Sequence, residues 1–260
     1  MDSTKKGDAL GQYRIEMMRQ ALEASGVDYT FSIYEDLMNQ ARRMSYLDEG
    51  KRFNVAIQGT SKTFEERFLP VRVPIYLGLG SGYRLILMRS ELQAELNGVR
   101  NLKMLQQYSI GQGTAWSDID IWRNAGFNVI ESSYKNLFGM AAKGRFDLYS
   151  RGLFEAYEEH RIFSQQFPNL AVDKALLVYY PFAIYIFVSP KYPEIHQALT
   201  EGMQALYRTG KLQTLLEANS AVATALAQAN LQQRQRIDLP AYNMTPESEA
   251  AIRHYVFKLQ

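Results

Sequence analysis

Residues 111–159 carry the clearest alternation of strand and helix signals in the chain and read GQGTAWSDIDIWRNAGFNVIESSYKNLFGMAAKGRFDLYSRGLFEAYEE. They open with a glycine-rich turn, Gly111–Thr114, that runs into a helical pattern starting near Trp116. A helix start leaves backbone N–H groups unpaired and carries partial positive charge, so this turn is expected to seat an anion. A strand later ends at Arg151, a bidentate donor suited to a carboxylate or phosphate. The stretch therefore predicts one compact α/β lobe with a binding edge.

Strand and helix patterns also alternate around this stretch. The expected strands are Tyr108–Ile110, Asn128–Glu131 and Phe146–Tyr149, and the expected helices are Trp116–Ala125, Tyr134–Lys143 and Leu153–Phe163. This alternation predicts a mostly parallel sheet flanked by helices. A similar alternation precedes Arg89 and includes an expected strand at Tyr29–Ile33, whereas helices alone are expected after the strand Phe182–Val188. The sequence therefore predicts two α/β lobes, with a helical tail that packs on the first.

Composition excludes several classes of protein. The 260 residues are 47% hydrophobic and 22% charged, which is typical of a globular protein large enough for one or two domains. A formal net charge of +2, with no basic block, gives no indication of nucleic-acid binding. No run approaches the roughly 20 apolar residues that a membrane-spanning helix needs.

The chain has no cysteine, which excludes disulfides, thiolate metal sites and a cysteine nucleophile. The first residues, Met1–Lys6, lack the apolar segment of a signal peptide. Two interpretations stay open at this point: a cytoplasmic protein, or a mature chain from which a signal peptide has been removed.

Catalytic patterns are weak. The three histidines, His160, His196 and His254, are far apart in expected helices and form no metal-binding motif. The glycines from Gly78 to Gly82 do not match the dinucleotide-binding pattern, and no nucleophilic serine motif or phosphate-binding loop occurs. Glu155 is the one acid that a catalytic role could use. No enzyme activity, cofactor or metal is therefore expected.

The order and spacing of several short motifs resemble a known family. They are Gly59-Thr60-Ser61 with Glu66-Arg67, Pro74-Ile75 through Gly82-Tyr83-Arg84, Gly111-Gln112-Gly113 with Trp116-Ser117-Asp118, Leu137-Phe138 to Gly144-Arg145-Phe146-Asp147, Arg151-Gly152, and Tyr180-Pro181 to Phe187-Val188. From Tyr13 to about Leu216 the chain resembles the family-3 extracellular solute-binding proteins of polar-amino-acid ABC transporters. Within that family it is most similar to an uncharacterised branch of transporter substrate-binding domain proteins.

The resemblance implies a type II periplasmic-binding-protein fold, an α/β fold of two lobes with mixed, mostly parallel sheets. Lobe 1 would comprise residues 1–89 and 183–260, lobe 2 residues 106–182, and the hinge segments about 90–105 and 180–183. Hinged lobes of this kind close around a ligand and exclude water. The resemblance also implies a periplasmic monomer, with its signal peptide removed, that binds a small molecule and works with a membrane ABC permease.

The resemblance further implies ligand-binding residues in both lobes. In lobe 1, Arg67 would hold the ligand carboxylate, with Thr60 and Ser61 as neighbouring donors. In lobe 2, Gly113 and Thr114 would supply backbone N–H groups and a hydroxyl. The family's acidic residue for an α-amino group falls at Gly152, which has no side chain. This departure weakens the case for an α-amino acid as ligand, and a second departure is that only Met1–Ala9 precedes the first helix, where the family has a strand.

Four further residues are expected near the ligand: Tyr83, Arg84, Trp116 and Arg151. Each predicted contact has a structural alternative. Arg67 follows two glutamates and could form surface ion pairs, while Arg151 could pair with Glu155 or Glu158. Thr114 could act only as a helix cap, and Trp116 only as a core aromatic.

Two hypotheses on function follow. The first is a non-enzymatic receptor that binds a small polar, anionic or amino-acid-like solute in an interlobe cleft for ABC-type uptake, with Arg67 and Arg151 meeting it from opposite sides. The second is a ligand-sensing or protein-interaction module of a signalling receptor with the same fold. The long helical tail after Gly210 motivates the second, because it could cover the surface of a partner.

Overall fold

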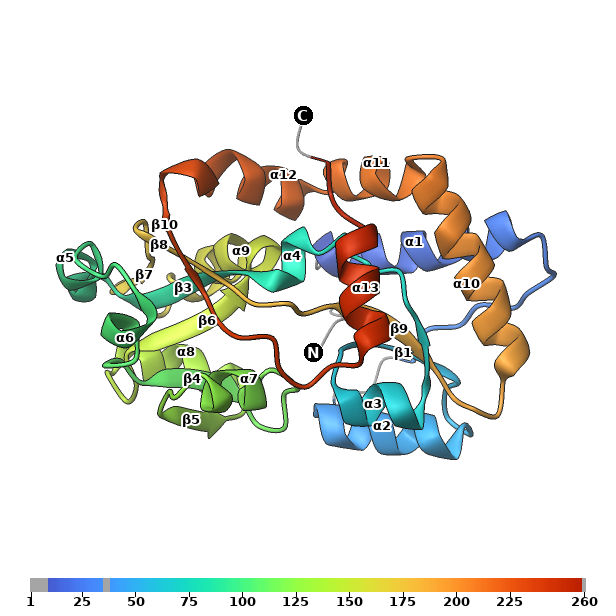
Figure 1. Cartoon of the computed structure of the whole chain (residues 1–260), viewed down its shortest axis with the longest axis horizontal. Helices are drawn as coiled ribbons and strands as arrows, with labels where there is room; N and C mark the ends of the chain where they lie inside the picture. Colours follow the sequence, from blue (N-terminus) through green and yellow to red (C-terminus); the bar gives the residue numbers. More distant parts are fainter. Residues whose placement is uncertain (1–8, 35–37, 259–260) are drawn as a thin grey trace. The chain divides into compact units, whose positions relative to one another are not determined.

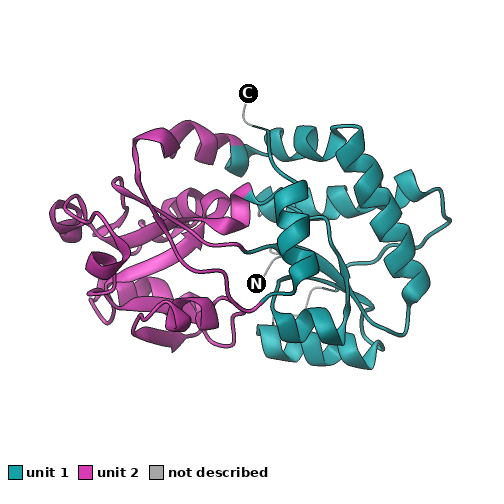
Figure 2. Cartoon of the chain, in the orientation of Figure 1, with its two compact units in different colours: residues 1–78, 182–222, 244–260 teal, residues 79–181, 223–243 magenta. Residues whose placement is uncertain are grey.

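The computed structural model describes residues 9–34 and 38–258, and the chain divides into two compact units (Figure 2). Unit 1 comprises Met1–Gly78, Phe182–Val222 and Met244–Gln260, and unit 2 comprises Leu79–Pro181 and Ala223–Asn243. These bounds differ from the expected lobes at residues 79–89, 182 and 223–243, and the expected hinge segment 90–105 lies within unit 2. Residues 79–89 belong to unit 2 because the strand that they contain, Tyr83–Arg89, pairs with the strand Leu148–Gly152 of that unit. Residues 223–243, which were expected in lobe 1, also belong to unit 2.

The sheet of unit 1 has the strand order β1-β9-β2. Its strands are β1 (Val55–Gly59), β9 (Ile184–Val188) and β2 (Leu69–Val71). Both outer strands run antiparallel to β9, with Ile57 opposite Ile186 and Val71 also opposite Ile186. The central strand reads IYIFV and is buried along its whole length, as its continuous apolar pattern requires.

Helices cover both faces of this sheet (Figure 1). They are α1 (Ala9–Ser25), α2 (Gln40–Glu49), α3 (Lys62–Arg67), α10 (Pro193–Arg208), α11 (Lys211–Glu217), the start of α12 (Ser220–Gln228), and α13 (Pro246–His254). On one face, a core cluster joins Met44 of α2 and Ile252 of α13 to Ala56 and Phe187 of the strands. The other face carries α10, with α1 packed along it.

The α1–α10 contact depends on one glycine. A Cβ built on Gly202 of α10 would lie 1.8 Å from the carbonyl oxygen of Ala21 in α1. Only a residue without a side chain lets the two helix backbones approach this closely. The apolar residues of α1 that the sequence places at helical spacing, including Met17 and Leu22, are buried accordingly.

The sheet of unit 2 has the order β10-β8-β3-β6-β4-β5, and β7 also pairs with β3. The strands are β3 (Tyr83–Arg89), β4 (Ile110–Gly113), β5 (Val129–Ser132), β6 (Leu148–Gly152), β7 (Leu170–Val172), β8 (Leu176–Tyr179) and β10 (Gln235–Asp238). The pairs β4–β5, β4–β6 and β8–β10 are parallel, whereas β3 is antiparallel to its neighbours. The sheet is therefore mixed, and its parallel strands β4, β5 and β6 belong to the βαβ region expected from the sequence.

The helices of unit 2 are mostly short. They are α4 (Leu79–Gly82), η1 (Ser90–Leu92), α5 (Gln93–Leu96), α6 (Leu102–Leu105), α7 (Ile119–Asn124), α8 (Tyr134–Ala142), α9 (Leu153–Phe163), the larger part of α12, and η2 (Leu231–Gln233). The longest, α8 and α9, pack together through the rings of Phe138 and Phe163, which stack with centroids 3.6 Å apart. No described helix is both long and apolar enough to cross a bilayer.

Four expectations about elements are wrong. Residues Tyr29–Ile33 form no strand, and the tail contains the strand β10, which pairs in parallel with β8. The glycine-rich segment is the strand β4 rather than a turn, and α7 begins at Ile119 rather than near Trp116. Position 111 requires a glycine because a Cβ there would lie 2.2 Å from the ring of Phe146.

Candidate functional site

Strand register places polar side chains of unit 2 on both faces of its sheet. Gly111 of β4 pairs with Tyr149 of β6, so the next residue along each strand, Gln112 and Ser150, are neighbours on the opposite face. Arg84 of β3 lies on that same face, because its Nε donates to the hydroxyl of Ser150 (3.2 Å). Arg151, next to Ser150, points to the face that Tyr149 occupies.

Arg151 lies in a buried cluster of acids and aromatic rings. Its guanidinium donates to both carboxylate oxygens of Glu159 at 2.5 and 2.6 Å, and its Nη2 lies 3.0 Å from Glu155. Its side chain is 3% exposed. Burial acts to lower the pKa of Arg151, but the two carboxylates outweigh it and raise the pKa well above its usual value. Arg151 is therefore a satisfied internal cation, the alternative considered from the sequence, with Glu159 in place of Glu158.

The same cluster fixes Trp116. The guanidinium carbon of Arg151 lies 4.8 Å from the centre of the Trp116 ring, and the rings of Trp116 and Tyr149 stack at 6.5 Å. A Cβ on Gly113 would lie 2.1 Å from the indole, so the ring rests directly on the strand. Trp116 is thus held in place from two sides and remains partly exposed.

Arg84 belongs to a second buried network, on the other face. Its Nη2 donates to Asp118 (3.1 Å), which also accepts a hydrogen bond from the hydroxyl of Tyr180 (2.9 Å). Its Nη1 donates to the carbonyl of Ser81 (3.2 Å). The side chain of Arg84 is 4% exposed, so its guanidinium lies in the protein interior.

Gln112 is a buried amide on this face without a partner. The residue is fully buried, yet neither its Nε2 nor its Oε1 has a hydrogen-bond partner in the part of the chain that the structure describes. A buried polar group left unpaired costs about 1–3 kcal/mol. Such a group indicates a place for an ordered water or a polar ligand atom.

The segment after β4 is the accessible part of this region. Thr114 is exposed, and its backbone N–H is already used, because it donates to Ser132 (2.9 Å). The backbone N–H groups of Ala115, Ser117 and Asp118 have no acceptor among the described residues. These three N–H groups and the Thr114 hydroxyl are hydrogen-bond donors that lie close together in the sequence.

Tyr83 lies apart from both networks. Its ring packs against Tyr179 at 4.9 Å, and the guanidinium of Arg236 covers both rings, at 5.5 and 4.4 Å. Arg236 also pairs with Asp238 (2.6 Å). Residue types alone gave no indication of this partly exposed aromatic–cation stack, because β10 was not predicted.

In unit 1, Thr60 and Ser61 hold α3. The side chain of Ser61 caps this helix by accepting from the backbone N–H of Phe64 (3.3 Å). The Thr60 hydroxyl donates to the buried carboxylate of Glu65 (2.5 Å), which also accepts from Ser248 (2.5 Å) and Thr245. Thr60 and Ser61 are themselves buried, so both hydroxyls serve the local structure.

Arg67, the predicted carboxylate grip, lies at the end of α3 and is half-exposed. Its Nη2 and Nε donate to the two carboxylate oxygens of Asp48 at 2.8 and 3.3 Å. The same bonds lower the pKa of Asp48 below its ordinary value. Nη1 takes no part in this pair, so one edge of the guanidinium remains available.

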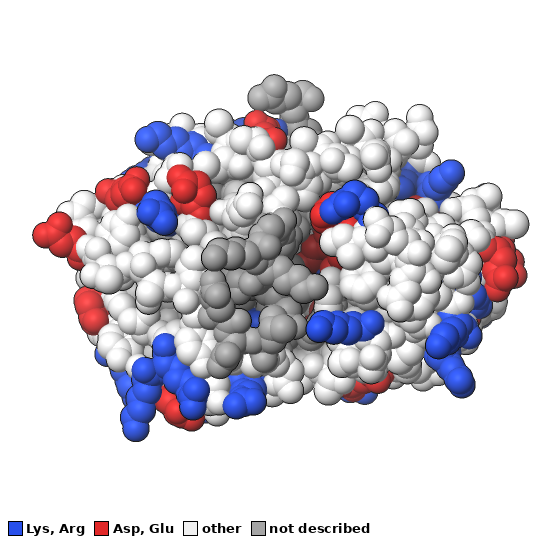
Figure 3. Space-filling model, turned by 180° about the vertical axis from the view of Figure 1, so that it is seen from behind, with Lys and Arg blue, Asp and Glu red and all other residues white. Residues whose placement is uncertain are grey.

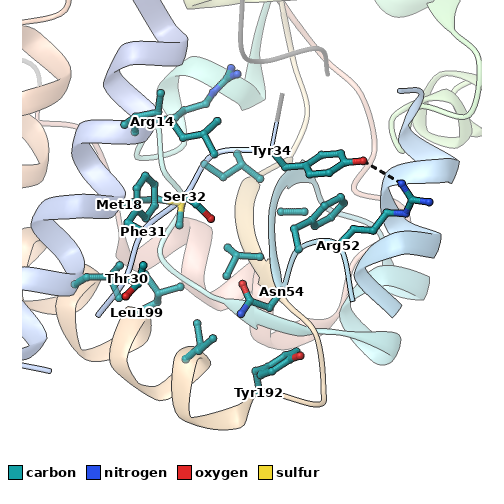
Figure 4. A pocket seen from close by; sticks show the side chains of 18 of the residues that line it. Arg14, Met18, Thr30, Phe31, Ser32, Tyr34, Arg52, Asn54, Tyr192 and Leu199 are labelled. Carbon is teal, nitrogen blue, oxygen red and sulfur yellow. Dashed lines mark hydrogen bonds between the residues drawn. The ribbon is translucent and has the colours of Figure 1, made fainter. Parts of the chain in front are cut away.

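A cavity of about 500 Å³ in unit 1 was not foreseen from the sequence (Figure 4). Its walls come from α1, the segment Tyr29–Tyr34, β1 and the start of α10. No sequence motif marks it, because its lining is drawn from segments far apart in the chain. Among the described residues no group of three potential metal ligands occurs, in this cavity or elsewhere.

On the face drawn in Figure 3, the charged side chains that can be seen form no broad patch of one sign that would guide the choice of site. Lys and Arg side chains lie among Asp and Glu side chains in this view (Figure 3). This distribution agrees with the balanced composition of the chain.

Solved structures establish the fold. An amino-acid ABC transporter substrate-binding protein from Streptococcus pneumoniae, AbpA bound to L-arginine, matches with a TM-score of 0.59 and 16% identity, over 82% of this chain and 84% of that one. The arginine-, lysine-, histidine-binding protein ArtJ from Geobacillus stearothermophilus matches with a TM-score of 0.56 and 15% identity, over 80% and 85%. The chain thus has the two-lobed fold of periplasmic binding proteins.

A third structure extends the range of proteins with this fold. A histidine kinase sensor domain with similarity to periplasmic binding proteins matches with a TM-score of 0.58 and 17% identity, over 80% of this chain and 85% of that one. No protein-family model matches the sequence, and no curated protein matches it either. At these identities the likeness shows the fold, and function has to be argued from the residues.

Proposed function

We propose that this chain is a non-enzymatic binding protein for a small polar solute, amino-acid-like or anionic, in ABC-type uptake. The fold supports this proposal, since several solved proteins that share it are described as amino-acid-binding. The interlobe cleft expected from the sequence stays a prediction. So do the periplasmic location, the permease partner and the monomeric state.

The observation that carries the proposal is the donor-rich segment after β4. Ala115, Ser117 and Asp118 offer backbone N–H groups for which residues 9–34 and 38–258 supply no acceptor, beside the exposed hydroxyl of Thr114. Unpaired donors of this kind suit a carboxylate or another anion. Trp116, held on Gly113, gives the segment a fixed aromatic wall.

The other predicted residues take different roles in this proposal. Arg151 and Arg84 do not grip the solute, because each guanidinium is buried and already paired with acids; they hold Trp116 and Asp118 in position. Thr60 and Ser61 likewise support α3. Arg67 keeps a proposed role as a carboxylate contact through its remaining edge.

Thermal unfolding in the presence of candidate solutes tests the proposal. L-amino acids, dicarboxylates and other small anions are added singly, and a true ligand at one hundred times its dissociation constant stabilises the protein by about 2.7 kcal/mol. In Gly113→Ala the new Cβ displaces Trp116, so we expect the stabilisation by that ligand to be lost. Thr114→Val should weaken binding about tenfold, whereas Thr224→Val, an exposed threonine of α12, should leave it unchanged. No stabilisation by any solute would refute the proposal.

A sensor module of a signalling receptor is the second candidate. The histidine kinase sensor domain that shares this fold favours it. The complete reading frame of the gene distinguishes the two functions. A membrane-spanning segment joined to a kinase or other output domain would support the sensor, and a neighbouring gene for an ABC permease would support uptake.

A further inference from the structure

The cavity of unit 1 lies along the free edge of a β-strand. Val55, Ala56 and Ile57, three consecutive residues of β1, line it. In the strand order β1-β9-β2, β1 is an outer strand that pairs with β9 alone among the described strands. Figure 4 shows the extended segment from Thr30 to Tyr34 beside the cavity.

The backbone of β1 presents unpaired groups to the cavity side. The carbonyl of Asn54 accepts from Ser189, and the N–H of Thr60 donates to Ala183, so the even-numbered residues of β1 face β9. In an antiparallel pair the alternate residues point their N–H and C=O groups the other way. Val55 and Ile57 therefore direct theirs away from β9, and within the described chain neither has a partner there.

The cavity continues the plane of the sheet rather than lying above one face. Met18 of α1 and Leu199 of α10 line it from the helical layer on one face. Arg43 of α2 lines it from the layer on the other face. A space beside an outer strand and between two helical layers has the position that a further strand would take.

The lining also has a definite chemistry. Apolar and aromatic side chains form much of it, and among the described residues its charged members, Arg14, Arg43, Lys51 and Arg52, are all basic. Two of the lining residues, Tyr29 and Ile33, are large apolar side chains that remain exposed. An occupant with apolar side chains and negative charge would complement both features.

We propose that this cavity is a strand-acceptor site, which binds an extended peptide segment of another polypeptide by pairing it with β1. The segment would carry apolar side chains at alternate positions and acidic residues at its ends. Main-chain hydrogen bonds to Val55 and Ile57 would provide affinity, and the alternate side chains would enter the space between the helices. A small molecule fits less well, since the backbone groups of these two residues repeat at about 6.6 Å, the period of a strand. The site lies within unit 1 and shares no residue with the proposed solute site.

Fluorescence polarisation with synthetic peptides tests the proposal on the whole chain. The probe is a fluorescein-labelled peptide, EVTVTVE, and the comparison peptide KVTVTVK reverses its end charges. We expect the first to bind and saturate, and the second to bind at least tenfold more weakly. Two further peptides are N-methylated, one at the odd and one at the even positions, which removes the hydrogen bonds of one edge. We expect at least one of the two N-methylated peptides to lose binding. Undiminished binding by both of them, or no binding by EVTVTVE, would overturn the proposal.

A proline in β1 tests the same contact from the protein side. Ile57→Pro removes an N–H that faces the cavity, while the ladder to β9 uses Ala56 and Gln58 and is kept. We expect at least a tenfold loss of peptide affinity, whereas Ile57→Val keeps the N–H and should bind within twofold of the parent. Undiminished binding by a folded Ile57→Pro protein would refute pairing with β1. If that variant does not fold, the N-methylated peptides decide the question.

Discussion

The guanidinium of Arg151 and the carboxylate of Glu159 form a two-point ion pair inside unit 2, with N–O distances of 2.5 and 2.6 Å. Glu159 also accepts from the hydroxyl of Tyr134 (2.9 Å), and Glu155 adds a second carboxylate next to the cation. A buried pair of this kind contributes little net energy when intact, but removing one partner leaves an uncompensated charge. The pair therefore gives a sharp test of whether Arg151 has a structural role.

Replacing Arg151 by methionine should destabilise unit 2 by about 3–5 kcal/mol at neutral pH, because two carboxylates then remain buried without their cation. Burial raises the pKa of Glu159, so the folded variant takes up a proton more readily than the unfolded chain and regains stability as the pH falls. Both tryptophans, Trp116 and Trp122, lie in unit 2, so urea unfolding followed by tryptophan fluorescence at pH 7 and pH 5 reports this unit directly.

Two control variants accompany that measurement. Arg161→Met removes an ion pair with Glu158 at the surface of α9, the helix that also carries Glu155 and Glu159. We expect it to change the free energy of unfolding by no more than about 0.5 kcal/mol. Adding Glu155→Gln and Glu159→Gln to Arg151→Met removes the buried charges and should restore most of the loss. If Arg151→Met hardly changes the free energy of unfolding but abolishes solute binding, Arg151 is a ligand contact rather than a structural cation.

The helix contact at Gly202 gives a second prediction. Alanine normally favours a helix over glycine by about 1 kcal/mol, yet here its Cβ would collide with the backbone of Ala21. Because backbone cannot move aside as a side chain can, we expect Gly202→Ala to destabilise unit 1 by about 2–3 kcal/mol. Hydrogen exchange should show reduced amide protection in α1 and α10. Glu201→Ala, exposed on the same helix, should change neither protection nor stability, and equal behaviour of the two variants would contradict the close contact.

The buried carboxylate of Glu65 gives a third prediction. Hydroxyls of Thr60, Ser248 and Thr245 donate to it, which joins the start of α3 to the start of α13. Glu65→Ala removes the acceptor of all three donors, and we expect a loss of about 3 kcal/mol in thermal or urea unfolding. Glu65→Gln keeps one acceptor oxygen and should lose about half as much. Glu66→Ala, which is exposed, should be neutral, and a neutral Glu65→Ala would show that the network does not hold the helices together.

Local signals predicted the elements whose burial is regular. The helix Leu153–Phe163 has the bounds expected from the sequence, and β9 follows from its continuous apolar run. The strand β10, QRID, has a single buried residue, Ile237, and it exists because β8 offers a free edge. Pattern reasoning has no access to such a cause, since it is a tertiary contact.

In the candidate site, too, local sequence signals identified residues but not their tertiary contacts. Residue types pointed to the arginines and to the Gly113–Trp116 segment, a choice that stays a prediction, but they did not reveal which side chains were already paired. The partner of Arg84 is Asp118, 34 residues away, and the partner of Arg67 is Asp48, 19 residues before it. Separations of this size are set by the fold, and one sequence alone carries no signal for them.

The pair between Asp48 and Arg67 gives the last prediction, which links structure to ligand binding. Hydrogen bonding from Arg67 lowers the pKa of Asp48 below its ordinary value of 3.8, so the pair contributes stability at neutral pH and loses it as the pH falls through the folded pKa. In Arg67→Ala the Asp48 pKa, followed by carbon NMR, should rise toward 3.8, and Arg67→Lys should give an intermediate value because it lacks the two-point geometry. If Arg67 also binds a ligand carboxylate through its remaining edge, saturating ligand places a second negative charge near Asp48 and raises the Asp48 pKa in the parent protein. An Asp48 pKa that does not move when a proven ligand binds would show that Arg67 serves only to join α2 and α3.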